Sequence, residues 1–175
     1  GYNASGSLMQ ASNGKLYGMT MNGGVNNQGV IFEYDYLTNT YIKKIELTDA
    51  LGILPKGSLM QASIGKLYGM TSGGGLKDFG VIFEYDYASN TYVKKIDLFT
   101  APSGSNPLGS LIQASNGKLY GMTSEGGVNE KGVIFEYDFV TNTYAKKIDL
   151  SNNLGYEPRG SLMQASNGKL YGMTQ

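Results

Sequence analysis

Paired carboxylates are the residues of this chain whose type and spacing most readily suggest chemistry. Glu33 and Asp35 lie two residues apart, and the same pair recurs twice more, as Glu84 with Asp86 and as Glu136 with Asp138. Residues two apart in a strand share a face, so each pair could do acid/base work on a glycosidic bond or help to hold a calcium ion. A catalytic pair needs one distinctive environment that separates its two pKa values, and a pair repeated in every copy has none. We therefore interpret the carboxylates as partners of lysines on the next strand, or as caps in the turns.

The composition excludes several other classes of site. The chain has 175 residues with no His and no Cys, so a Ser/His/Asp triad, a Cys nucleophile, a disulfide framework and zinc or haem sites built on these side chains are excluded. The 14 Lys and Arg residues balance the 14 Asp and Glu residues. No basic cluster suits nucleic acid, and no apolar run approaches the roughly 18 residues of a membrane span. We expect no cofactor, no nucleic-acid partner and no membrane insertion.

A long internal repeat organises the whole chain. The segment GSLMQASNGKLYGMT begins at Gly6 and returns, nearly unchanged, after 51, 52 and 51 residues. The chain is therefore one repeat array with units at 6–56, 57–108 and 109–159 and a partial unit at 160–175. Such a period indicates repeated supersecondary units that stack on one another.

Each repeat predicts four short strands. In the first copy these are residues 7–11, 15–20, 29–35 and 40–47, which are rich in β-branched and aromatic residues. Ser-Asn-Gly and Thr-Asn-Thr join them as two hairpins, although Ile64 replaces the turn Asn in the second copy. No segment keeps a helical apolar period, so we predict an all-β protein.

Four antiparallel strands in about 50 residues match one blade of a β-propeller of the kelch type. The runs GKLYGMTSEGG (117–127) and GVIFEYDFVTNTY (132–144) are similar to the second kelch strand with its glycine pair and to the segment that follows it, and Pro158-Arg159 resembles the entry to a first strand. One departure is that Tyr stands where kelch blades commonly carry Trp, at Tyr41, Tyr92 and Tyr144.

Three and a half blades cannot close a propeller, since known propellers use at least four. We therefore expect the array to be a piece of a longer chain or assembly. A β-trefoil is the alternative fold, because it closes with three repeats of four strands. It leaves no place for the fourth partial copy, and the chain has no Trp for the motif of trefoil lectins.

The chain more closely resembles the GloVer (Gloeo/Verruco-type) tandem repeat of large bacterial surface and secreted proteins. The core of that repeat looks like GxLYGxT, a glycine pair and a later G.VF, and it fits residues 14–32, 65–83 and 117–135, with 168–174 as a truncated match. The resemblance implies secretion and a propeller-like array. It implies no reaction and no particular ligand.

The repeated residues also predict how the units pack. In the strand 29–35, Val30, Phe32 and Tyr34 share one face while Ile31 shares the other with the carboxylates. Glycine inside a strand commonly marks close packing, so we expect an aromatic ring of the adjacent blade against the glycines of the second strands, Gly18, Gly69, Gly121 and Gly172. The Lys-Lys pairs lie on the fourth strand, where lysine protects an exposed sheet edge.

Loops and tyrosines are the candidate binding surfaces. The loop between the second and third strands keeps its glycines but varies at its tip, and the linkers between repeats vary most. Tyrosines of the second strands could pack or bind, because the ring carries a polar tip. The candidate ligand-binding residues are Asn22, Asn26, Asn27, Lys77, Asp78, Glu125, Asn129, Glu130, Tyr17, Tyr68, Tyr120 and Tyr171.

These observations favour a non-enzymatic module of a secreted or cell-surface bacterial protein, a structural or binding scaffold for a protein or glycan partner. A second hypothesis is a multivalent lectin whose blades hold the same sugar weakly and gain by avidity. An enzyme with carboxylates at one end of the channel ranks last, since no distinctive site is visible.

Overall fold

The computed structural model describes residues 1–99 and 102–175. These residues form short strands and no helix, so none of them provides a helix that could cross a membrane. The strands of the first two repeats are β1 (Met9–Gln10), β2 (Leu16–Thr20), β3 (Val30–Asp35), β4 (Thr40–Glu46), β5 (Met60–Gln61), β6 (Leu67–Thr71), β7 (Val81–Asp86) and β8 (Thr91–Asp97). Those of the last two are β9 (Ile112–Gln113), β10 (Leu119–Thr123), β11 (Val133–Asp138), β12 (Thr143–Asp149), β13 (Met163–Gln164) and β14 (Leu170–Tyr171).

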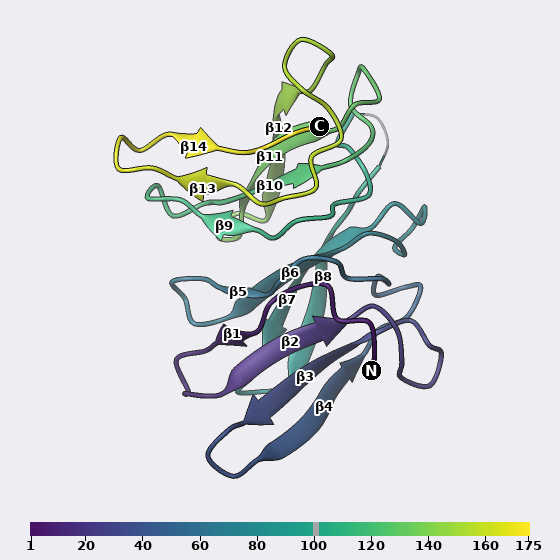
Figure 1. Cartoon of the computed structure of the whole chain (residues 1–175), viewed down its shortest axis with the longest axis vertical. Helices are drawn as coiled ribbons and strands as arrows, with labels where there is room; N and C mark the ends of the chain where they lie inside the picture. The colour runs from purple at the N-terminus through teal and green to yellow at the C-terminus, as the bar shows by residue number, and fades with distance from the viewer. Residues whose placement is uncertain (100–101) are drawn as a thin grey trace.

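Each full repeat is one four-stranded antiparallel sheet whose strands follow the chain order. The sheets are β1-β2-β3-β4, β5-β6-β7-β8 and β9-β10-β11-β12, and β13 and β14 form a two-stranded sheet. The predicted all-β class and the two hairpins of each repeat are confirmed. The sheets follow one another along the long axis of the molecule, with the first repeat at one end and the β13–β14 hairpin at the other (Figure 1).

The first hairpin of each repeat closes in the same way. In the first copy Gly14 N–H donates to the Ala11 carbonyl (2.9 Å), and Asn13 Oδ1 accepts from Lys15 N–H (3.1 Å). Ile64 cannot make the side-chain bond, yet Gly65 N–H still donates to the Ala62 carbonyl (2.8 Å). The backbone turn with its positive-φ glycine is thus sufficient to form the hairpin.

Two faces of each sheet pack against different neighbours. We call the face turned to the preceding repeat the leading face and the one turned to the following repeat the trailing face. The trailing face of the first repeat includes Met9, Ala11, Tyr17, Met19, Ile31 and Ile45, and it packs on the leading face of the second, which includes Leu59, Leu67, Val81, Phe83 and Tyr85. The equivalent residues of the second and third repeats form the next cluster, so the core is the set of interfaces between sheets.

Polar contacts join the first strands at every interface. Ser7 N–H donates to Ser58 Oγ (2.8 Å), and Ser12 N–H donates to Gln61 Oε1 (2.9 Å). The same two bonds recur between the second and third repeats and between the third and fourth, at 2.7 to 2.9 Å. This inter-repeat ladder explains why Ser and Gln recur at fixed places in GSLMQAS.

In the three full repeats the aromatic ring that covers the second-strand glycine comes from the same sheet, not from the adjacent blade as the sequence suggested, and Gly172 of the partial repeat lies against Leu162 and Met122 with no ring. Gly69 of β6 pairs directly with Phe83 of β7, and a Cβ added at Gly69 would lie 2.5 Å from Phe83 Cζ. Gly18 with Phe32 and Gly121 with Phe135 repeat the arrangement. The ring folds over the glycine opposite it because a neighbouring strand is nearer than a neighbouring sheet.

A bulge in each fourth strand sets the positions of the lysines. Ile31 pairs with Ile45 while Phe32 pairs with Lys43, so Lys44 is the extra residue of the first copy. Lys44 therefore reaches Glu33 (3.5 Å) while Ile45 still joins the interface. These lysines therefore have partners within the sheet, since Lys43 also pairs with Glu46, and edge protection stays a prediction.

Candidate functional site

A cluster of Tyr, Glu and Lys recurs in each full repeat, at the end of the sheets that carries the hairpin turns. In the first copy Glu33 accepts a hydrogen bond from Tyr17 OH (2.7 Å) and pairs with Lys15 Nζ (2.8 Å). Asn13 of the turn donates to Tyr17 OH (2.9 Å). The second and third copies repeat the cluster with Tyr68, Glu84 and Lys66, and with Tyr120, Glu136 and Lys118. The sequence predicted lysines of the fourth strand as the partners, and these lie at 3.5 to 3.6 Å, while the nearer lysines precede the second strand and were not predicted.

The cluster keeps its glutamates ionised. Burial alone would raise the pKa of Glu84, but the hydrogen bonds from Lys66 and Tyr68 and the charge of Lys95 outweigh it, so the pKa lies below the usual 4.5. The Glu33 pKa is lowered in the same way. At Glu136 the bond from Tyr120 is the main cause of a lowered pKa. A carboxylate that is ionised and fully partnered at neutral pH is a poor general acid.

The aspartates of the carboxylate pairs cap turns. Asp35 Oδ1 accepts from the backbone N–H groups of Leu37 (3.0 Å) and Thr38 (3.3 Å). Asp86 and Asp138 cap the equivalent turns, where the backbone bonds contribute to a lowered pKa for each. Among the residues that the structure describes, no three acidic side chains gather to hold a metal ion.

The candidate tyrosines differ in exposure from one end of the array to the other. Tyr17 and Tyr68 are completely buried, so their side chains pack and donate to glutamates and offer no binding surface. Tyr120 is half-buried and Tyr171 is exposed, because fewer strands follow them. Burial also raises the pKa of Tyr68.

The loops after the second strands lie at the opposite end of the sheets and are held by the last residue of each fourth strand. Glu46 accepts from Val25 N–H (2.9 Å), Asp97 from Leu76 N–H (2.8 Å) and Asp149 from Val128 N–H (2.8 Å). Each carboxylate ties the loop just beyond the glycine pair, so the loops are fixed on the scaffold.

Most candidate loop residues maintain their own loop. Asn27 accepts from Tyr2 OH (2.8 Å) and Gly23 N–H (2.9 Å), and Asp78 accepts from Gly74 N–H (2.6 Å). Asn27, Asp78 and Glu130 have positive φ at the loop tip. Asn22 and Glu125 accept from asparagines of the preceding linker, and Asn26, Lys77 and Glu130 are exposed.

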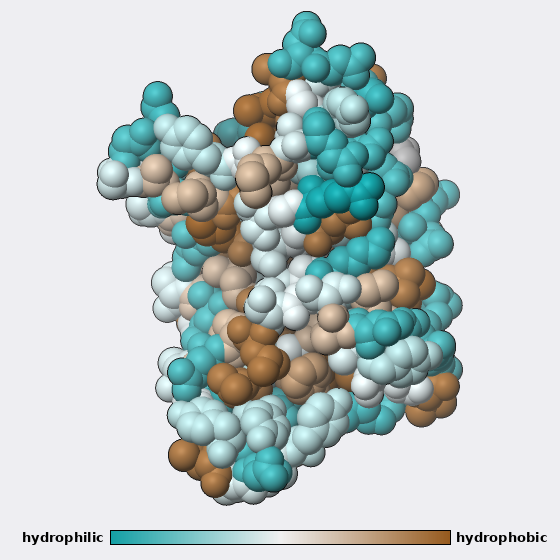
Figure 2. Space-filling model, viewed as in Figure 1, coloured by the Kyte–Doolittle hydropathy of each residue, from teal (hydrophilic) through white to brown (hydrophobic). Residues whose placement is uncertain are grey.

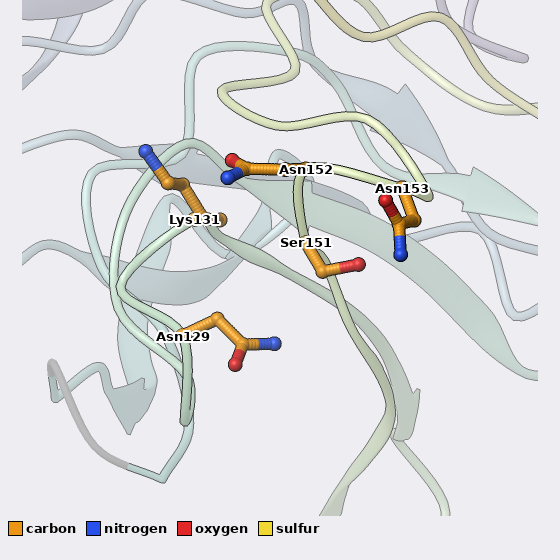
Figure 3. A pocket seen from close by; sticks show the side chains of 5 residues that line it. All are labelled: Asn129, Lys131, Ser151, Asn152 and Asn153. Atoms are coloured by element: carbon orange, nitrogen blue, oxygen red, sulfur yellow. The ribbon is translucent and has the colours of Figure 1, made fainter.

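Among the candidate loop residues, Asn129 lines a pocket. An open pocket of about 410 Å³ lies between the β10–β11 loop and the segment after β12. Asn129 and Lys131 come from the loop, and Ser151, Asn152 and Asn153 come from the segment (Figure 3). Asn129 Nδ2 donates to the Leu150 carbonyl (2.9 Å), which leaves its carbonyl oxygen for a ligand. Lys131 Nζ lies 5.0 Å from the centroid of the Tyr156 ring.

The pocket residues are specific to the third repeat. In the first repeat Gln28 and Asp49 occupy the positions of Lys131 and Asn152, and Gln28 Nε2 donates to Asp49 Oδ1 (2.7 Å) across the gap. In the second repeat the position of Lys131 is Phe79, and the positions of Asn152 and Asn153 lie outside the described residues. In the third repeat a lysine and an asparagine therefore stand at the two positions that the Gln28–Asp49 bond joins in the first repeat.

Sequence reasoning missed Lys131, Ser151, Asn152 and Asn153 as individual residues. The sequence predicts the linkers as variable binding surfaces but distinguishes no residue within them. The available signal was the change from Asp49-Ala50 to Asn152-Asn153 at equivalent positions. Two asparagines, whose amide groups can donate hydrogen bonds, replace an aspartate and an alanine there.

Solved structures that are similar to this chain share its fold at low sequence identity. The extracellular domain of a proposed hybrid two-component system from B. thetaiotaomicron has a TM-score of 0.67 and 14% identity over 96% of this chain. The extracellular domain of a proposed one-component system from the same organism has a TM-score of 0.66 and 14% identity over 96% of this chain. A proposed gluconolactonase has a TM-score of 0.62 and 13% identity. The match covers 95% of this chain and 56% of the gluconolactonase chain. This chain spans 20% of the length of each of the first two.

No curated protein matches the sequence. A family model described as the Gloeobacter/Verrucomicrobia repeat matches residues 1–175, which is the resemblance that the repeated GKLYGMT and GVIF segments predicted.

Proposed function

The chain belongs to the Gloeobacter/Verrucomicrobia repeat family, and from this premise we propose that it is a non-enzymatic binding module of a secreted or cell-surface bacterial protein. The partner is a protein or glycan that docks at the end of the array formed by the glycine-rich loops and linkers. The observation that carries the proposal is the polar pocket around Asn129 and Lys131, which sits on loops fixed by carboxylates of the sheet.

We propose further that the sheets are kelch-like blades of a β-propeller. Their strands run in chain order from one edge to the other, and each trailing face packs on the next leading face. The partial fourth repeat continues this stacking, with Leu162 buried as Leu59 and Leu111 are. A β-trefoil closes after three repeats and gives this fourth unit no such place.

An extracellular location is supported by the family resemblance and by two similar structures that are extracellular domains. Because this chain spans a fifth of their length, the activity and the partners of the whole protein are part of the proposal and not a finding. The acidic residues support a non-enzymatic module. The repeated glutamates are ionised and bound by Tyr and Lys, and the aspartates cap turns.

A multivalent lectin is the second candidate function. Amide side chains beside a lysine and an aromatic ring suit the hydroxyl groups and the face of a sugar. The pocket residues differ between the first and third repeats, and this difference favours one site over equal sites on every blade.

Screening the chain against glycan and peptide arrays, followed by calorimetric titration of any hit, tests the proposal. We expect the double substitution Asn129→Ala with Asn152→Ala to weaken binding about tenfold or more. Asn26→Ala, at the equivalent loop position of the first repeat, is the matched control and should leave the affinity unchanged.

Equal losses from Asn26→Ala and from the double variant would favour the multivalent lectin over a single site. Binding that both variants retain in full would remove the loop end as the site. A chain that binds no glycan and no peptide would contradict a binding role for these residues.

A further inference from the structure

The pocket between the β10–β11 loop and the segment after β12 contains one charged side chain. Among the residues that the structure describes, it is lined by Asn129, Lys131, Ser151, Asn152 and Asn153, and none of these is acidic or apolar. Figure 2 shows a largely hydrophilic surface at the upper right of the view, where Figure 1 places the β10–β11 loop. The pocket wall therefore carries a positive charge and no acidic side chain to balance it.

Lys131 differs in this respect from the lysines of the sheets. The Lys66 ammonium group, for example, lies 2.8 Å from a carboxylate oxygen of Glu84. In the part of the chain that the structure describes, Lys131 makes no such ion pair, although Glu130 precedes it and Glu157 N–H donates to its carbonyl oxygen (3.1 Å). A half-buried ammonium group in a pocket without a carboxylate suits an anionic group supplied by a ligand.

Two sequence changes together produce this unbalanced charge. In the first repeat Gln28 Nε2 donates to Asp49 Oδ1 (2.7 Å), at the positions of Lys131 and Asn152. A lysine opposite an aspartate would close the same gap with an ion pair. The third repeat has an asparagine there instead, so it lacks both the bridge and the opposite charge. Figure 3 shows the Asn152 amide extending toward Lys131.

The positions of Asn152 and Asn153 are open to solvent even where a full repeat follows them. In the first repeat these positions are Asp49 and Ala50. Both residues are exposed, although the second repeat packs beside them and Gly75 N–H donates to the Asp49 carbonyl (2.6 Å). A ligand can therefore reach this place from solvent in an internal repeat as well.

The uncharged side chains of the pocket suit sugar hydroxyl groups. Asn129 Nδ2 is bound to a backbone carbonyl, which leaves Oδ1 as an acceptor. The Ser151 hydroxyl can donate and accept, and the amides of Asn152 and Asn153 add further donors and acceptors. The volume of about 410 Å³ lies within the range of ligand sites, roughly 300–1,000 Å³, and suits a short segment of a sugar chain.

A sugar fits this pocket better than a protein partner does. Protein interfaces gain most of their affinity from aromatic and other large side chains that fill dry, close-fitting pockets. Within the described residues, no apolar side chain lines this pocket to receive such an anchor. Amide and hydroxyl groups around one cation match a ligand with many hydroxyl groups and one negative charge.

We propose that the pocket binds an acidic sugar, a unit of a polysaccharide that carries one negative charge as a carboxylate or as a sulfate ester. Lys131 Nζ pairs with the charged group, and Asn129, Ser151 and Asn152 bind the hydroxyl groups. The inference rests on the binding role proposed above and narrows its ligand to an anionic glycan.

Calorimetric titration of the full chain with matched oligosaccharides tests the proposal. The pairs are oligouronates with their methyl esters, and sulfated oligosaccharides with their desulfated counterparts. We expect at least one acidic member to bind at one site per chain, about fivefold or more tightly than its neutral counterpart. This difference should shrink as the salt concentration rises from about 20 mM to about 500 mM, because salt screens the ion pair. The acidic member that binds identifies the source of the charge.

Variants of one lysine separate charge recognition from binding of the hydroxyl groups. Lys131→Gln should remove the preference for the acidic member and leave the affinity for the neutral member unchanged, and Lys131→Arg should keep the preference. The first repeat already accommodates glutamine at this position, so the fold should tolerate the change. Lys56→Gln removes the same charge from another half-buried lysine, on a linker, and is the matched control that should bind as the wild type does.

A gain of binding can be tested in the first repeat. The triple variant Gln28→Lys with Asp49→Asn and Ala50→Asn should create a second site, because Asn26 and Thr48 already supply the amide and the hydroxyl. The titration should then give two sites per chain. Gln28→Lys alone should give one, since Asp49 would pair with the new charge.

Several results would overturn the inference. Equal affinity for acidic and neutral members, lost in the double variant Asn129→Ala with Asn152→Ala, would overturn it and leave the proposed binding role standing. Binding of acidic peptides in place of any oligosaccharide would have the same meaning. A triple variant that gains no site would overturn the assignment of charge recognition to Lys131 and its neighbours. A chain that binds no oligosaccharide and no peptide would remove both the inference and the proposed function.

Discussion

The Tyr68–Glu84 cluster shows how one residue type can suggest chemistry and serve structure. The Glu84 side chain is buried between Tyr68 and Lys66, with Lys95 nearby at 3.6 Å. Each partner favours the charged carboxylate, and their combined effect exceeds the cost of burial. Repetition of this cluster in three sheets makes the glutamates a shared source of pH-dependent stability.

Stability should fall in acid because of these glutamates. The pKa of Glu84 in the folded chain lies below 4.5, so its contribution is complete above about pH 4.5 and is lost as the pH falls through the folded value. We expect Glu84→Gln to cost about 1–3 kcal/mol in urea unfolding at pH 7, and less at acid pH, because the wild type progressively loses the same interaction as Glu84 becomes protonated. Glu130→Gln, on an exposed loop tip, is the control and should be neutral at both pH values. Equal costs of Glu84→Gln at the two pH values would contradict this account.

At the scale of the element, the pairing of Gly69 with Phe83 decides how β6 and β7 fit together. The Phe83 ring is completely buried and stacks on Tyr92 with a centroid distance of 4.8 Å. Tyr92 OH donates in turn to the Leu51 carbonyl of the preceding linker (2.5 Å). Tyr92 therefore connects its own sheet to the previous repeat.

Adding a side chain at this glycine should displace the ring. We expect Gly69→Ala to destabilise the chain by about 1–3 kcal/mol in chemical denaturation, because Phe83 is enclosed and cannot move freely. Combining Gly69→Ala with Phe83→Leu should recover part of the loss relative to the sum of the two single variants, since the smaller side chain leaves room. Strict additivity of the two changes would argue against a direct clash.

Several of these elements could be predicted from the sequence, and others could not. The period, the turn residues and the alternating apolar positions were enough to predict the strands of each repeat, with first strands only two residues long in the structure. The sequence predicts that the ring over Gly69 comes from the adjacent blade, whereas it comes from Phe83 of the same sheet. A glycine indicates that another group packs closely, but not the side from which that group comes. The pair Lys43-Lys44 also contains no pattern that predicts the bulge at Lys44.

The candidate site was predicted only in part for a similar reason. Asn129 was chosen because its loop varies at the tip. Lys131 and Asn152 become a pocket only when a loop and a linker about 20 residues apart in sequence lie side by side. Whether such a gap is closed depends on one pair of side chains, as the bond between Gln28 and Asp49 demonstrates.

At the scale of the whole molecule, the core consists of interfaces between sheets, and the position of a repeat in the array decides what its residues contribute. Equivalent leucines illustrate this: Leu111 lies in a closed interface and Leu8 on an open face. We expect Leu111→Ala to cost about 2–5 kcal/mol and Leu8→Ala less than about 1 kcal/mol, measured by urea unfolding at low protein concentration. Similar costs at the two positions would mean that the leading face of the first repeat is not open in solution.

The uniform inter-repeat ladder also bears on how such a gene can change. Because every boundary presents the same serines, glutamine and glycine to the next unit, removing or duplicating one 51-residue unit by recombination joins surfaces that already fit. Most insertions or deletions inside a protein core create a new and untested contact, but here a whole-unit change creates none. The number of units can therefore change without creating a new kind of contact between neighbouring repeats.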